Sequence, residues 1–399
     1  MKTKSIIIYF LILIGCNLQQ NKLKTFNLCE LPACRSIKLS ELGFVDIEYI
    51  PLETNENSLI YDRIDPGNLF DKIIAGKDFF IIKHFNSILK FSNKGSFVAK
   101  IGKVGRGPDE FQTCHDIVTD EEGKLIYILD GWKRKVFIYS DVGELMQAIN
   151  FPLAGLNYFC FVENRFLCYT SNHLGNVENS FNLIDTTGTI IKSYSNKYSF
   201  KKTRNDVYGI DHENLFYKYN GRLYKKEVYS DTVFLYENMI FKPYMIIKVG
   251  DKLITPQARS EVPSQQLAKD YIAPRNLFEF GNYVFYDFRY KFEMTFSGIK
   301  SEYYSFIGSK TSNFNALINN EIGLINDLDG GPNVLPLTIK DDHTIVGWIE
   351  VMKLKEHVSS EIFKNSIPKY PEKKKKLEML AASLKETDNP VLVLVRLKE

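Results

Sequence analysis

The sequence lacks any apolar run long enough to cross a membrane as a permanent helix. Its most apolar stretch, residues 5–15, is shorter than the about 20 residues that a spanning helix needs. Charge is nearly balanced, with 51 lysines and arginines against 48 acidic residues, so no concentrated basic face indicates nucleic-acid binding. The Gly-x-Ser-x-Gly and His-Glu-x-x-His motifs are also missing from the chain, and with them the usual signatures of serine hydrolases and zinc proteases.

Convincing helical periodicity is scarce before residue 350, whereas 23 tyrosines and 29 phenylalanines favour strands. Residues 91–102, 139–150 and 183–195 each run from an apolar segment through a polar turn with glycine to another apolar segment. The turn glycines, Gly95, Gly143 and Gly188, are 48 and 45 residues apart. Periods of about 40 to 50 residues are typical of four-stranded propeller blades.

The repeat predicts an all-β fold, a six-bladed β-propeller with a short C-terminal helical segment and a closing C-terminal strand. We place the blades near 67–103, 113–150, 156–196, 206–248, 275–308 and 312–350. Residues 254–275 are expected to form an insertion or a long loop between blades, and 371–386 a helix that begins at a proline. Two apolar strands near the chain ends, 44–53 and 389–398, are expected to close the ring, singly or together, because closure removes a free sheet edge.

The first residues predict export. Lys2 and Lys4 precede the apolar run, and Leu13-Ile14-Gly15-Cys16 resembles a bacterial lipoprotein signal in which Cys16 carries the lipid. The alternative is an ordinary signal peptide with an incidental cysteine. We expect a cell-envelope protein anchored in the outer membrane through its lipid. It would face the periplasm rather than the surface, because no acidic cluster follows the cysteine.

This interpretation divides the chain into four parts. They are a signal peptide at 1–15, a lipid-anchored tether at 16–36, the propeller at 37–350, and C-terminal helices with the closing strand at 351–399.

The remaining cysteines suggest two disulfides, which an exported compartment permits. Cys29 and Cys34 could close a small loop, and Cys160 and Cys168 flank a turn and could face each other across a hairpin. Cys114 would then be left as a buried thiol.

The glycine-rich stretch at 101–111, IGKVGRGPDEF, is predicted to be a linker. A phosphate-binding loop would need a helix after it, and an EF-hand loop would need acids at alternating positions before its glycine. Neither feature is present. Glycine and proline suit a tight crossing from the outer strand of one blade to the inner strand of the next.

Several stretches then carry a family resemblance. They are KIGKVGRGPDEF at 100–111, YIPLE at 49–53, YSDTVF at 229–234, INDLDGGPNVLP at 325–336 and DNPVLVLVRLK at 388–398. In this order they resemble the six-bladed propeller lipoproteins of the Bacteroides type, relatives of NHL-repeat propellers. The resemblance implies a six-bladed propeller and a lipid anchor, and it implies little about activity.

Candidate functional residues are few. His115 and Asp116 follow the linker, where a first strand should approach the central channel, so they could form a metal site or an acid–base pair. Asn326, Asp327 and Asp329 could bind Ca²⁺ or another divalent metal, or could instead hydrogen-bond nearby backbone in a turn. Linker residues that could reach the channel mouth are Arg106, Asp109 and Glu110.

These features favour a non-catalytic binding module, with no resident cofactor, that holds an envelope protein partner or a glycan or peptide ligand near the central channel. The alternative is a propeller lyase or hydrolase that acts on an extracellular glycan or peptide with a channel metal. A fold alone does not choose between them.

Overall fold

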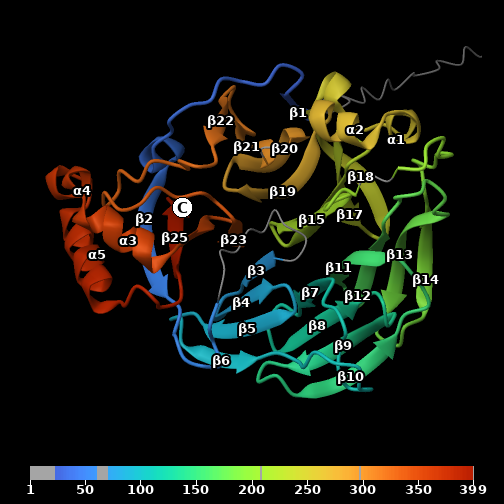
Figure 1. The fold of residues 1–399 in the computed structure, drawn as a ribbon, viewed down its shortest axis with the longest axis horizontal. Helices are drawn as coiled ribbons and strands as arrows, with labels where there is room; N and C mark the ends of the chain where they lie inside the picture. Colours follow the sequence, from blue (N-terminus) through green and yellow to red (C-terminus); the bar gives the residue numbers. More distant parts are fainter. Residues whose placement is uncertain (1–22, 61–70, 207–208, 296–297, 399) are drawn as a thin grey trace, which may run out of the picture.

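The computed structural model describes residues 23–60, 71–206, 209–295 and 298–398, and the strands in these residues form six sheets. Figure 1 shows the sheets arranged as a ring, in which each sheet is one blade. The predicted all-β propeller with six blades is therefore confirmed.

The first three blades follow one another along the chain, and each is a four-stranded antiparallel sheet. The first contains β3 (Asp71–Ala75), β4 (Phe79–His84), β5 (Ser87–Ser92) and β6 (Phe97–Lys100). The second contains β7 (Asp116–Thr119), β8 (Leu125–Asp130), β9 (Lys135–Ser140) and β10 (Leu145–Asn150). The third contains β11 (Leu156–Val162), β12 (Arg165–Thr170), β13 (Asn179–Asp185) and β14 (Ile190–Ser195).

The fourth blade has a fifth strand, because β1 pairs in parallel with its outer strand. This blade contains β15 (Asn214–Tyr219), β16 (Arg222–Glu227), β17 (Thr232–Glu237), β18 (Ile240–Lys248) and, at the edge, β1 (Lys24–Asn27). The fifth blade contains β19 (Ala273–Phe280), β20 (Tyr283–Thr295), β21 (Gly298–Ser309) and β22 (Asn315–Asn319).

The sixth blade joins the two ends of the chain. Its strands, from the inside outward, are β23 (Thr338–Asp341), β24 (Thr344–Ile349), β25 (Val391–Leu397) and β2 (Phe44–Pro51). The C-terminal strand β25 lies between β24 and the N-terminal β2 and pairs with both in antiparallel register. Both terminal strands therefore close the ring, as the sequence pattern predicted.

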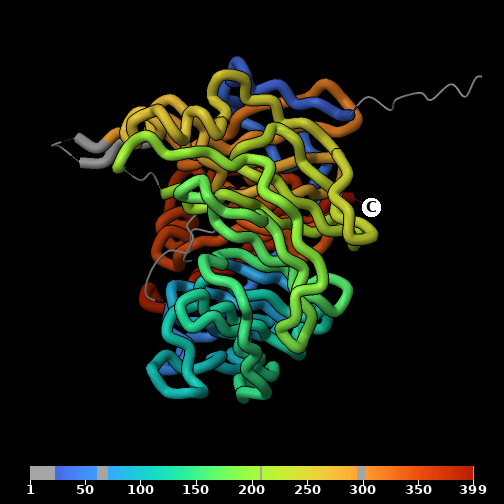
Figure 2. Tube along the Cα trace, turned by 90° about the vertical axis from the view of Figure 1, so that its right-hand side faces the viewer, coloured from blue at the N-terminus to red at the C-terminus, as the bar shows by residue number. Residues whose placement is uncertain are grey.

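The strand order places the start of every inner strand on one face of the ring. Each blade has four antiparallel strands counted outward from its inner strand, so all inner strands run in the same direction. The helices are inserted on this face too: α1 (Pro256–Glu261) and α2 (Ser264–Asp270) follow β18, while α3 (Val351–Ser359), α4 (Glu361–Asn365) and α5 (Pro371–Ser383) follow β24. Figure 2 shows these segments toward one side of the ring, and we call this side the helical face.

The apolar core lies between neighbouring blades. The middle strands of the blades are buried on both faces. This explains why stretches such as Phe79–His84 are continuously apolar and do not alternate between apolar and polar residues. One cluster joins the sixth blade to the first through Val346, Leu392 and Phe80. Similar clusters fill the next contacts around the ring.

The repeated turn glycines mark contacts between blades. Gly95, Gly143 and Gly188 all have φ between 85° and 91°, a left-handed conformation that suits glycine. A Cβ on Gly95 would lie 2.0 Å from the carbonyl oxygen of Pro51, at the end of the preceding blade's outer strand. The other two meet the ends of β6 and β10 at 2.6 and 2.3 Å. The regular spacing of these three glycines in the sequence therefore reflects both a tight turn and a close approach between neighbouring blades.

The glycine-rich linker crosses from β6 to β7, as predicted. Its backbone folds on itself, with N–H···O bonds from Gly105 to Phe111 of 2.9 Å and from Phe111 to Lys103 of 3.1 Å. The Glu110 carboxylate accepts a 3.0 Å hydrogen bond from the Gly107 N–H and fills the space that a Cβ on Gly105 would need.

Three expectations need correction. Residues 24–27, expected within the tether, form β1 and add an edge to the fourth blade. The strand at 315–319, assigned to the sixth blade, belongs to the fifth, which therefore extends beyond residue 308. From the range assigned to it, the sixth blade takes only β23 and β24. The separately predicted closing strands β25 and β2 complete it, and α3–α5 lie between β24 and β25 along the chain.

Closure can be tested at Val395, which is buried and lies opposite both Ile47 and Ile345. Val395→Asp would bury an unpaired carboxylate between two strands, and we expect a loss of about 3–5 kcal/mol in unfolding free energy. The measurement is urea denaturation followed by circular dichroism. The matched control is Arg396→Gln, at the adjacent exposed position. Equal midpoints for the two variants would contradict this role of β25.

Candidate functional site: the central cavity

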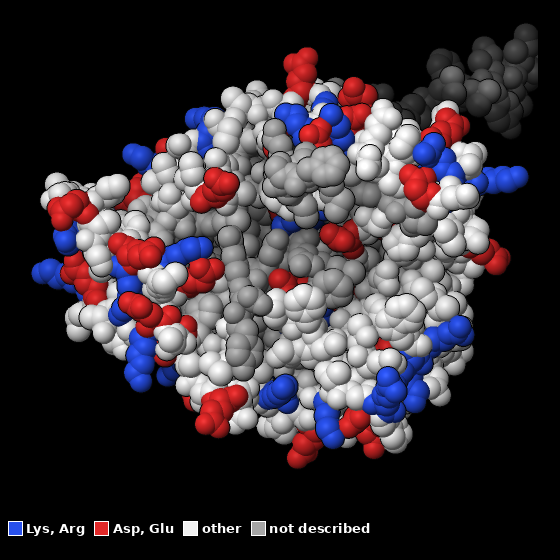
Figure 3. Space-filling view, in the orientation of Figure 1, with Lys and Arg blue, Asp and Glu red and all other residues white. Residues whose placement is uncertain are grey.

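A cavity of about 460 Å³ follows the axis of the ring. All six inner strands contribute to its wall: β3, β7, β11, β15, β19 and β23. Figure 3 shows acidic and basic side chains near the middle of the ring on the face in view. The volume lies within the about 300–1,000 Å³ of typical small-molecule pockets.

Asp116 ties three inner strands together at the cavity wall. Its Oδ1 lies 2.7 Å from Nζ of Lys72 on β3, and its Oδ2 accepts a 3.2 Å hydrogen bond from the N–H of Phe159 on β11. The same ammonium donates to the carbonyl of Ile117 at 2.9 Å. Both carboxylate oxygens of Asp116 therefore link neighbouring inner strands, so this predicted site residue has a structural role in the cavity wall.

His115 lies beside Asp116 in the chain and also lines the cavity. Its Nδ1 accepts a 3.1 Å hydrogen bond from the N–H of Gly131, in the turn between β8 and β9. Burial lowers the pKa of His115, because removal from water disfavours the charged imidazolium. The indole of Trp132, in the same turn, has its centroid 6.1 Å from that of the imidazole and is 75% exposed.

Asn214 is a cavity residue that the sequence did not single out. It begins the inner strand β15 and is 1% exposed, yet neither its Oδ1 nor its Nδ2 has a hydrogen-bond partner among the described residues. An unsatisfied buried amide costs about 1–3 kcal/mol. No local signal distinguishes it, since asparagine at a strand start usually belongs to a turn.

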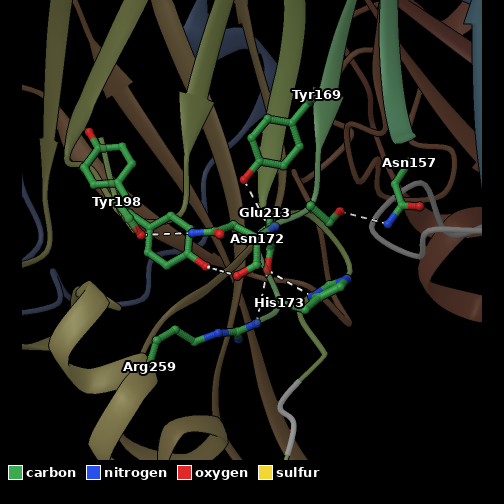
Figure 4. A network of polar contacts seen from close by, with 9 residues as sticks. Asn157, Tyr169, Asn172, His173, Tyr198, Glu213 and Arg259 are labelled. Carbon is green, nitrogen blue, oxygen red and sulfur yellow. Dashed lines mark hydrogen bonds and ion pairs between the residues drawn. The ribbon is translucent and has the colours of Figure 1, made fainter. Parts of the chain in front are cut away.

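A buried carboxylate, Glu213, lies behind this part of the wall at the contact between the third and fourth blades (Figure 4). Its Oε1 lies 3.1 Å from Nη2 of Arg259, on α1, and 3.1 Å from Nδ1 of His173. Its Oε2 accepts hydrogen bonds from the N–H of Asn172 at 2.5 Å and the hydroxyl of Tyr169 at 3.3 Å. The inserted helix is thus bound to the ring through an ion pair.

The network also orients the cavity residues on either side of Glu213. Glu213 lies in the bend before β15 and points into the blade contact, whereas its chain neighbours His212 and Asn214 line the cavity. The side chain of Asn172 continues the network with a 2.9 Å hydrogen bond to the carbonyl of Tyr198 (Figure 4).

The other predicted site residues lie away from the cavity. Asn326 and Asp329 form a turn in which Asn326 Nδ2 donates to Asp329 Oδ1 at 2.7 Å and Gly331 N–H donates to the same oxygen at 2.9 Å. Tyr49 of β2 contacts both side chains. Asp327 points elsewhere and accepts hydrogen bonds from the N–H and hydroxyl of Ser40.

The three side chains of this motif therefore do not converge on one point. Among the described residues, no group of three histidine, cysteine or acidic side chains could hold a metal ion.

The linker residues also lie outside the cavity lining. Arg106 and Asp109 are exposed, while Glu110 forms an ion pair of 2.8 Å with Lys103. Cys16, the predicted lipidation site, lies outside the described residues.

The four cysteines proposed to form disulfides are free. Cys160 lies opposite Leu167 on the next strand, and Cys168 lies opposite Phe159, so the two thiols point to opposite faces of the blade. Cys29 contacts Gly250 after β18, whereas Cys34 is bridged to Leu317 of β22. The two lie on different blades, which is why the short sequence spacing misled the prediction.

The ring of blades and its cavity define a β-propeller with a central pocket of small-molecule size. A family model described as domain of unknown function DUF4934 matches residues 23–396, and the chain therefore belongs to this family. No curated protein matches the chain. Within the described residues, no helix is long and apolar enough to cross a membrane.

Two crystal structures from Bacteroides have a similar fold. One, a candidate exported protein of Bacteroides fragilis, is 15% identical with a TM-score of 0.63, over 94% of this chain and 99% of that one. The other, a DUF4221 family member from Bacteroides vulgatus, is 10% identical with a TM-score of 0.52, over 89% and 97% of the two chains. At these identities the likeness shows the fold alone.

The Glu213 network predicts a strong charge dependence of stability. Glu213→Gln keeps the size of the side chain but removes the charge opposite Arg259, and we expect a loss of about 3–5 kcal/mol in unfolding free energy. Guanidinium denaturation gives the value, and the double variant with Arg259→Met should recover much of it. Arg204→Gln, in an exposed ion pair with Asp206, is the control and should change little. A Glu213→Gln variant as stable as this control would contradict the prediction.

Proposed function

We propose that this protein is a lipid-anchored binding module of the bacterial cell envelope that holds a small ligand in its central cavity. The observation that carries the proposal is Asn214, a buried side chain in the cavity wall whose two polar atoms have no partner among the described residues. Buried polar groups are almost always hydrogen-bonded, and a ligand in the cavity would supply the bonds.

The wall chemistry favours binding over catalysis. One Asp116 oxygen pairs with the Lys72 ammonium, and the other accepts a hydrogen bond from Phe159. The His115 Nδ1 accepts a hydrogen bond from Gly131, so these contacts fix the positions of both side chains in the wall. Groups used in this way are held rigidly, and a rigid wall lowers the entropy lost on binding.

The anchor rests on the signal-like start of the chain and on the resemblance to propeller lipoproteins. Because β1 is fixed to the fourth blade from Lys24, a chain that starts at Cys16 spans at most about 30 Å before it reaches the propeller. The propeller would therefore lie close to the bilayer, and we propose the periplasmic side of the outer membrane.

The anchor can be tested by membrane fractionation. Cys16→Ala should move the protein from the membrane fraction to the soluble fraction, because no lipid could be attached. Cys34→Ala, which removes an exposed cysteine elsewhere, should remain with the membrane. Retention of Cys16→Ala in the membrane would contradict the lipoprotein assignment.

Ligand binding can be tested by native mass spectrometry of protein extracted from its own envelope. We expect a non-covalent adduct that is lost in Val118→Trp, because Val118 lines the cavity and a larger side chain would fill it. Val98→Trp is the matched control, since Val98 lies on the outer strand β6 and is 41% exposed. An adduct that persists equally in both variants would place the ligand elsewhere.

A further inference from the structure

We propose that the ligand is an uncharged saccharide, with one sugar ring against Trp132 at the cavity mouth and hydroxyl groups bound by Asn214. The inference rests on the proposed function, because it names the chemical class that the cavity would bind. It depends on the exposed indole, the unsatisfied amide and the internal pairing of the nearby charges.

Trp132 is presented by a braced turn. Asp130 accepts hydrogen bonds from the N–H groups of Lys133 at 2.9 Å and Gln112 at 2.6 Å. The Lys133 ammonium donates to the carbonyls of Gly107 and Glu110 at 2.9 and 2.6 Å. The glycine-rich linker thus holds the turn in place while the indole remains 75% exposed.

Such an indole suits stacking against a sugar. A rigid aromatic surface supplies a large contact area at low entropic cost, and its polarised face attracts the C–H groups of a sugar ring. The turn lies on the helical face, since it joins the second and third strands of its blade. Trp132 does not itself line the cavity, but its indole centroid lies 6.1 Å from that of His115, which does, so the indole lies next to the helical-face end of the cavity.

Asn214 lies at the same end of the cavity, because it begins an inner strand. Its amide offers two N–H donors and one carbonyl acceptor. A sugar hydroxyl both donates and accepts, so a pair of neighbouring hydroxyls would satisfy both ends of the amide. Tyr158 and His212, with ring centroids 5.7 Å apart, also line the wall and give it aromatic surface near Asn214.

The charges of the wall favour an uncharged ligand. Lys72 pairs with Asp116 at 2.7 Å, and Arg275 pairs with Asp287 at 3.1 Å. The other charged side chains of the lining are three lysines and three aspartates, Lys83, Lys218, Lys340, Asp71, Asp341 and Asp342, so the wall has no large net charge that would attract an anion or a cation. The side-chain amide of Asn214 can therefore offer hydrogen bonds to an uncharged ligand.

The test uses the protein's own fluorescence. The sequence has 2 tryptophans, Trp132 and Trp348, so Trp348→Phe leaves Trp132 as the single reporter. This variant is titrated with neutral oligosaccharides (cellobiose, maltose, chitobiose and mannobiose), with uronic-acid disaccharides and with short peptides. We expect a saturable change in emission with at least one neutral saccharide and none with the charged saccharides or the peptides.

Two variants locate the site by calorimetric titration with the same saccharide. Asn214→Leu and Trp132→Ala should each weaken binding at least about tenfold, because each removes one of the two contacts. Asn214→Leu should leave the thermal midpoint unchanged or higher, since it removes an unsatisfied buried amide. Met146→Ala, at an exposed position on β10 of the same blade, is the control and should bind normally.

The outcomes separate this inference from the proposed function. A native adduct that Val118→Trp removes, but that is not a saccharide, would overturn the saccharide class and leave a binding cavity. Saccharide binding that both variants retain would overturn the site. A lower thermal midpoint in Asn214→Leu would indicate that a buried water satisfies the amide, and, together with unchanged binding in Trp132→Ala, would also overturn the inference.

Discussion

The pairing of β25 with β2 and β24 is the contact on which the rest of the structure depends. Without it the ring would have two open edges, and an open sheet edge exposes unpaired backbone groups. The apolar clusters lie between blades, so each blade needs a neighbour on both sides to bury its faces. The cavity likewise exists because six inner strands surround it. The pairing of the C-terminal strand β25 with β2 and β24 therefore determines whether every blade has a neighbouring blade on both sides.

Apolar contacts alone do not fix how two neighbouring blades are aligned. Buried charged side chains between the blades favour one alignment. Lys225 is nearly buried between the third and fourth blades, where its ammonium lies 4.2 Å from the ring centre of Phe181 and 4.6 Å from that of Phe241, beside the carboxylate of Glu227. Burial lowers the pKa of this lysine, because removal from water disfavours the charged ammonium. Such groups stabilise one alignment of two blades over others, because displacement would leave a charge unpaired.

The sequence predicted features that depend on local chemistry. The turns at Gly95, Gly143 and Gly188, the middle strands and the linker were all recovered, because glycine geometry and apolar runs act over a few residues. The closing role of the two terminal strands was also predicted, but the strands that they join were not, because α3–α5 separate β24 from β25 along the chain. Asn214 was missed for a related reason. Its lack of a hydrogen-bond partner within the described part of the chain is a property of the assembled wall, and in the sequence it looks like any asparagine of a turn. The disulfide expectations failed at Cys160 and Cys168 because strand alternation, rather than spacing, decides which side chains meet.

The number of strands in each blade explains why Trp132 and Asn214 lie toward the helical face. In each of the first five blades, four consecutive strands return the chain to the face on which it started, so the crossing from each of these blades to the next falls there. The opposite face has short hairpin turns, such as the one at Asn220-Gly221, whose two residues both have positive φ. Long crossings can carry insertions and polar groups without disturbing the sheets. The glycine-rich linker shows the consequence: a segment required for connection also braces the turn of Trp132 through Lys133, so the architecture of the ring shapes the mouth of its cavity.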